Sequence, residues 1–110
     1  MRHMFESNIP LDNAEEVIDQ AVDNLRQYCT SISKRNGGYH LDFKTSSAAI
    51  RAYDNGLLVS VGGDEVIDCD GTKTLIISQI SRYAIGMPLC TLWVEASDER
   101  FAATRRKRPG

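Results

Sequence analysis

The stretch AAIRAYDNGLLVSV, residues 48–61, decides the fold of this chain. At its centre, Asp54-Asn55-Gly56 joins two runs of alternating apolar residues, 48–52 before it and 57–61 after it. Asn and Gly tolerate the positive φ angles that a tight type I′ turn requires. The stretch therefore predicts an antiparallel β-hairpin whose alternating apolar side chains share one face of a sheet.

On the N-terminal side of the hairpin, apolar residues recur every three or four positions between residues 14 and 32. This spacing predicts an amphipathic helix that begins near Asp12 and ends at Asn36-Gly37-Gly38. Residues 1–11 are expected to form an extended arm. Between the helix and the hairpin, residues 39–44 alternate between apolar and polar side chains, which predicts a half-buried strand.

On the C-terminal side, residues 62–65 are expected to form a loop, and Val66-Ile67 a short edge strand. Helical periodicity returns at Gly71, with Asp70 as the expected cap, and ends at Gly86 and Pro88. Residues 89–96 then predict a last strand, with Trp93 on the face opposite its apolar stripe.

These elements predict the α+β class, a two-layer domain with an antiparallel sheet of four to five strands and two helices on one face. The expected order is α-β-β-β-(β)-α-β, within a single domain that spans residues 12–97. Residues 98–110 are expected to be a disordered tail or a linker. The core is expected to include Leu25, Ile50, Val59, Ile80 and Leu92.

The formal charge of −2 on the 110 residues conceals an asymmetry. Residues 98–110 carry five basic and two acidic groups, a net +3, which leaves −5 on residues 1–97. An acidic body argues against nucleic-acid binding. The basic run Arg105-Arg106-Lys107-Arg108 is a candidate partner-binding tail, and its alternative reading is a solvated end or linker.

We expect a cytoplasmic protein without a membrane partner, because no apolar run approaches the roughly 18 residues that span a bilayer. The first residues also lack the apolar stretch of a signal peptide. The three cysteines form no CxxC pair, which fits reduced thiols. We expect Cys29 and Cys90 to be buried and Cys69 to lie in an exposed loop.

The residues with catalytic or metal-binding chemistry are few. His3 and His40 are the only histidines, so neither a metal site nor a cofactor is expected. His40 and Asp42 lie two positions apart on one strand face and could pair as a general base. No Ser or Cys is locally arranged with them, so we expect binding rather than catalysis.

The run Ser78-Gln79-Ile80-Ser81-Arg82-Tyr83-Ala84, followed by Leu89 and Thr91-Leu92-Trp93, resembles a bacterial family known as domain of unknown function 2218. Residues 25–29, 41–43 and 55–58 are also similar to that family. Two positions depart from its pattern: Gln79 replaces the family's usual His, and residues 85–88 replace a more polar junction. Members of the family occur alone or joined to siderophore-interacting flavoproteins.

The resemblance implies an accessory domain in siderophore and iron handling, with such a flavoprotein as its partner. Two alternatives stay open: a stand-alone protein that binds a small ligand on the free sheet face and Trp93, and an enzyme with an unmarked site. The candidate ligand-binding residues are Arg82, Trp93 and His40. The oligomeric state cannot be inferred from the sequence.

Overall fold

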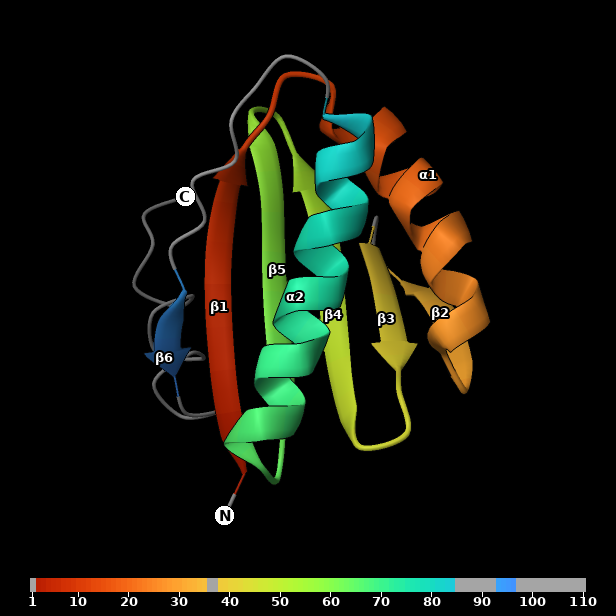
Figure 1. Cartoon of the computed structure of the whole chain (residues 1–110). Helices are drawn as coiled ribbons and strands as arrows, with labels where there is room; N and C mark the ends of the chain where they lie inside the picture. The colour runs from red at the N-terminus through yellow and green to blue at the C-terminus, as the bar shows by residue number, and fades with distance from the viewer. Residues whose placement is uncertain (1, 36–37, 85–92, 97–110) are drawn as a thin grey trace.

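The hairpin around Asn55 forms the middle of the sheet. It consists of β4 (Ser46–Tyr53) and β5 (Gly56–Gly63), which pair antiparallel with Tyr53 opposite Gly56, so the predicted hairpin is confirmed. Its two turn residues are Asp54 and Asn55, whereas Gly56 is the first residue of β5 and does not adopt a left-handed φ angle, so the turn lies one residue before the expected Asn-Gly pair. The computed structural model describes residues 2–35, 38–84 and 93–96. Within them, six strands form one antiparallel sheet in the order β2-β3-β4-β5-β1-β6 (Figure 1). The predicted α+β class is confirmed, with one more strand than the largest number expected.

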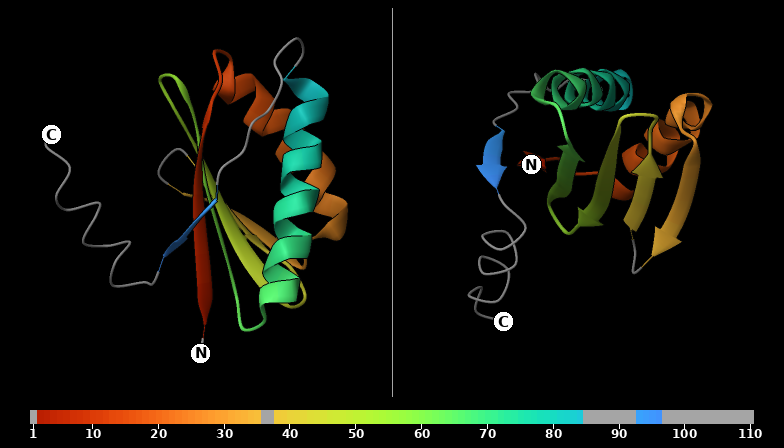
Figure 2. Two further views of the ribbon diagram at one scale, coloured as in Figure 1. Left: turned by 60° about the vertical axis from the view of Figure 1, so that its left-hand side comes forward. Right: turned by 90° about the horizontal axis from the view of Figure 1, so that it is seen from below.

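The remaining elements complete the sheet and cover one of its faces. They are β1 (His3–Pro10), α1 (Ala14–Leu25), a 3₁₀ turn (Arg26–Tyr28), β2 (Ser31–Arg35), β3 (Gly38–Asp42), α2 (Val66–Tyr83) and β6 (Val94–Ala96). Both helices lie on the same face, as predicted, and within the described residues the opposite face carries no helix (Figure 2). We call that opposite face the free face of the sheet.

One hydrophobic core lies between the helices and the sheet. It contains four of the five predicted core residues, Leu25, Ile50, Val59 and Ile80, each at most 1% exposed, while Leu92 lies outside the described residues. Residues 14, 17, 18, 21 and 25 of the predicted helical stripe are buried in α1, which confirms the period of that helix. No helix in the described ranges is long and apolar enough to span a membrane.

The expected arm at residues 1–11 is instead an integral strand. All eight residues of β1 pair with β5, and residues 4–6 also pair with β6. Ile9 is fully buried and Leu11 is 2% exposed, so this segment contributes to the core. The segment is extended, as expected, but its partners are more than 40 residues away in the sequence, where local patterns give no signal.

The first helix is shorter than its periodicity predicts, and it begins at Ala14 after an N-cap at Asn13 rather than at Asp12. Its α-helical part ends at Leu25, and residues 31–35 form β2, which pairs with β3. Ile32 lies opposite Leu41 in this pairing. Ser31, Ile32 and Ser33 have only modest helix propensity, so pairing with a neighbouring strand decides the conformation of this segment.

The second helix begins earlier than predicted, at Val66 instead of Gly71. Val66 and Ile67 are therefore helical rather than an edge strand, and Asp70 lies inside the helix rather than at its cap. Gly71 is tolerated within it, since an exposed helical glycine costs about 1 kcal/mol relative to alanine.

Gly62 and Gly63 belong to β5, not to a loop. The expected last strand is described only at residues 93–96, of which β6 takes Val94–Ala96. The predicted basic tail and its boundary at residue 98 lie outside the described residues.

Candidate functional site

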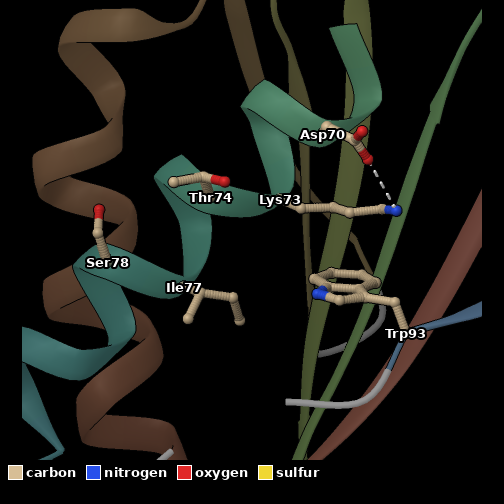
Figure 3. A pocket seen from close by; sticks show the side chains of 6 residues that line it. All are labelled: Asp70, Lys73, Thr74, Ile77, Ser78 and Trp93. Atoms are coloured by element: carbon tan, nitrogen blue, oxygen red, sulfur yellow. Dashed lines mark hydrogen bonds and ion pairs between the residues drawn. The ribbon is translucent and has the colours of Figure 1, made fainter. Parts of the chain in front are cut away.

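An open groove of about 520 Å³ lies between the outer surface of α2 and the indole of Trp93. Its described lining consists of Asp70, Lys73, Thr74, Ile77, Ser78 and Trp93 (Figure 3). Five of these residues come from α2, at positions i, i+3, i+4, i+7 and i+8, which share one side of the helix. Trp93 comes from the segment just before β6. We call this site the Trp93 groove.

Pairing between β1 and β6 positions Trp93. Phe5 of β1 lies opposite Glu95 of β6, which brings the segment that enters β6 against the first half of α2. Phe5 and Trp93 are both partly buried and pack against the core. The two rings therefore belong to segments almost 90 residues apart in the sequence that the sheet makes neighbours.

Lys73 of α2 contacts both aromatic rings and a carboxylate. Its Nζ lies 3.3 Å from the centre of the Phe5 ring and 5.6 Å from the centre of the Trp93 ring, and both distances are within cation–π range. The same ammonium group donates a hydrogen bond to Asp70 Oδ1 at 3.2 Å. The Lys73 side chain is 13% exposed, against 61% for Asp70, so the lysine is a packed element of the groove wall.

The remaining groups of the groove suit binding more than bond cleavage. Ile77 offers an apolar surface, and Thr74 offers an exposed hydroxyl. Ser78 donates its hydroxyl hydrogen to the carbonyl of Leu75, so its oxygen remains an acceptor. A flat ring, a branched side chain and two hydroxyls are the usual contents of a small-molecule site.

Of the three ligand-binding candidates from the sequence, Trp93 alone lines the groove. Arg82 is exposed on α2, one turn beyond Ser78 on the same side of the helix. His40 lies on β3, where its alternation with buried Leu41 places it on the free face, on the opposite side of the sheet. The structure therefore does not unite these three residues in one site.

The expected pairing of His40 with Asp42 is present, with Nε2 3.3 Å from Oδ1. Beyond the local sequence to which the prediction applied, Ser31 of β2 donates a hydrogen bond to Asp42 Oδ2 at 2.8 Å. This contact depends on β2–β3 pairing, which the sequence pattern did not reveal. Ser31 bonds the carboxylate, not the imidazole, so the geometry is not that of a nucleophile next to its base.

The cysteines differ from expectation. Cys69 is fully buried within α2, not exposed in a loop, and Cys29 is partly exposed. Burial raises the pKa of the Cys69 thiol, although the positive charge of Lys73 acts in the opposite direction. Burial likewise raises the pKa of Cys29. Cys90 lies outside the described residues.

A second concavity, of about 540 Å³, lies at the start of α1. Its lining includes the carboxylates of Asp12, Glu15, Glu16 and Asp54. Within the described ranges, no three His, Cys, Asp or Glu side chains converge in a geometry that could hold a metal ion. Local sequence patterns do not predict this acidic surface, because Asp54 is brought to it by the central hairpin.

Comparisons with known proteins add evidence on the fold only. No model of a known protein family matches the chain, and no curated protein matches it. Among solved structures, the NMR structure of PA4090 from Pseudomonas aeruginosa is similar, with a TM-score of 0.70. The match covers 84% of this chain and 95% of that chain at 12% sequence identity. At this identity, the two chains share the arrangement of helices and strands.

Proposed function

We propose that this domain is a binding module and that its site for a small, partly apolar ligand is the Trp93 groove. The observation that carries the proposal is the groove itself, whose volume of about 520 Å³ lies in the range of small-molecule sites. Lys73 fixes one wall through two aromatic rings and a carboxylate. A wall held in this way loses little conformational freedom when a ligand binds.

A second candidate is an accessory role in siderophore and iron handling, with a siderophore-interacting flavoprotein as partner. One observation favours it: Ser78 and Trp93, which both lie in the stretches similar to domain of unknown function 2218, line the groove. In this case the groove would take either a small ligand passed to the flavoprotein or a segment of the flavoprotein itself. A cytoplasmic location belongs to this proposal, supported by three cysteines without a CxxC pair.

Fluorescence tests the proposal directly, because Trp93 is the only tryptophan in the chain. A set of small aromatic fragments is titrated into the protein, and saturable changes in the tryptophan emission identify binders. Thr74→Phe places a ring in the groove from an exposed position and should weaken these binders about tenfold, the equivalent of roughly 1.4 kcal/mol.

The matched control is His40→Phe, which adds the same ring on the free face and should leave affinity unchanged. Binding that Thr74→Phe does not weaken would place the site elsewhere. The absence of any saturable binder at millimolar concentration would contradict the small-ligand proposal. A change in emission on mixing with a siderophore-interacting flavoprotein, lost in Thr74→Phe, would support the second candidate.

A further inference from the structure

The indole Nε1–H of Trp93 is a hydrogen-bond donor that, in the part of the chain the structure describes, has no acceptor. The ring contacts of Trp93 are with Lys73, and these involve its π face rather than its N–H. Figure 3 shows the indole nitrogen on the edge of the ring turned toward Ile77, inside the groove. This N–H does not belong to the buried polar atoms without a partner in the described residues, so it is open to the groove and to solvent. A ligand that covers it must supply an acceptor, because an N–H buried without a partner costs free energy.

The charges of the groove favour an uncharged ligand. The two ionisable side chains of its described lining, Lys73 and Asp70, form an ion pair with each other at 3.2 Å. The Lys73 side chain is also largely covered, so its ammonium group is not free to neutralise an anion. A ligand of this groove therefore needs no net charge. It does need a hydrogen-bond acceptor at its edge, to pair with the N–H of Trp93.

The apolar surfaces favour a flat ring. Ile77 and the edge of the indole face each other across the groove (Figure 3). A planar aromatic molecule can contact both without the loss of rotational freedom that a flexible chain would suffer. The exposed hydroxyl of Thr74 offers a second, adaptable hydrogen bond.

We infer that the ligand of the Trp93 groove is an uncharged, planar aromatic molecule with a hydrogen-bond acceptor at its edge, which Trp93 Nε1–H binds. This inference rests on the proposed function, because it specifies the ligand class of the same groove. Trp93 then acts as the residue that sets specificity, since a ring without an accessible acceptor leaves the N–H unpaired. Lys73 is a positioning residue that holds the indole in place.

Two isomeric probes test the inference, 6-methylquinoline and 8-methylquinoline, both uncharged at neutral pH. They share size and composition, but the methyl group of the 8-isomer blocks access to the ring nitrogen. The single tryptophan gives a single indole cross-peak in a proton–nitrogen correlation spectrum. We expect 6-methylquinoline to move this peak downfield saturably. It should also bind about fivefold more tightly than the 8-isomer, because a fivefold ratio of affinities corresponds to the net contribution of one ordinary hydrogen bond.

Trp93→Phe removes the N–H and keeps a ring, so it should bind both isomers equally, as measured on the backbone peaks of Thr74 and Ile77. Equal affinities of the unmodified protein for the two isomers would overturn the inference, as would an indole peak that stays in place while those backbone peaks move. In either case the proposed function survives. If neither isomer moves any peak of the groove, the inference fails, whereas the small-ligand proposal fails only if the fragment titration also finds no saturable binder.

Discussion

Replacing Ile9 with alanine separates the two interpretations of the N-terminal segment. Local sequence patterns describe residues 1–11 as an arm, whereas the structure places Ile9 in β1, opposite Leu57 in the middle of the sheet. The Ile9 side chain is fully buried in the core. Its neighbour Asn8 is exposed on the free face, so Asn8→Ala is a matched control in the same strand.

The burial of Ile9 sets the expected loss of stability in Ile9→Ala. Truncation of a buried isoleucine to alanine costs about 2–5 kcal/mol through lost transfer energy and the cavity left behind. A domain of this size is stable by about 5–15 kcal/mol, so the loss is a large share of the total. With a urea dependence of about 1–3 kcal/mol per molar, the unfolding midpoint should fall by about 0.7–5 M. Asn8→Ala removes a long, exposed hydrogen bond from the Tyr53 hydroxyl and should lower the free energy of unfolding by at most about 1 kcal/mol.

Urea unfolding of the unmodified protein and both variants, followed by circular dichroism and by the emission of Trp93, measures the difference. Two-state behaviour is established by coincident transitions with the two probes. An Ile9→Ala midpoint equal to that of Asn8→Ala would refute the placement of β1 within the sheet. If Ile9→Ala proves too unstable to purify, Ile9→Val should still lower the free energy of unfolding by about 0.5–1.5 kcal/mol.

Three further predictions concern glycines, thiols and the tail. Gly56→Ala should destabilise the protein by about 1–3 kcal/mol in thermal unfolding, because its methyl group would overlap the backbone of β1. Gly71→Ala should instead stabilise it by about 0.5–1 kcal/mol, because no heavy atom lies within 4 Å of the added carbon. Cys29 should react with iodoacetamide before fully buried Cys69, and mass spectrometry of the labelled peptides would reveal the opposite order. Since burial raises the pKa of both thiols, each should hold less thiolate at neutral pH than a free cysteine, and both rates should rise with pH. Ending the chain after Ala96 should change the free energy of unfolding by less than about 0.5 kcal/mol, and a clear drop in melting temperature would show that residues 97–110 stabilise the fold.

Some contacts of the candidate site can be predicted from local sequence patterns, and others cannot. The pairing of His40 with Asp42 is predictable because a strand repeats every two residues, which places both side chains on one face. Trp93 is noticeable as the single tryptophan of the chain. The contact of Lys73 with Phe5 has no local signal, because it requires α2 to cross β1 at that residue.

The sequence by itself determined the central hairpin, the two amphipathic helices and the single buried face of the sheet. These features follow from turn chemistry and hydrophobic period, which act over fewer than about ten residues. Only the tertiary structure decided that residues 3–10 and 31–35 are strands and that the rings of Phe5 and Trp93 lie around Lys73. A strand is stabilised by hydrogen bonds to a partner that can lie anywhere in the chain, so its local sequence need not show that it is a strand. The groove depends on the same non-local pairing, because β1 must bring β6 to α2 before Trp93 can face Ile77.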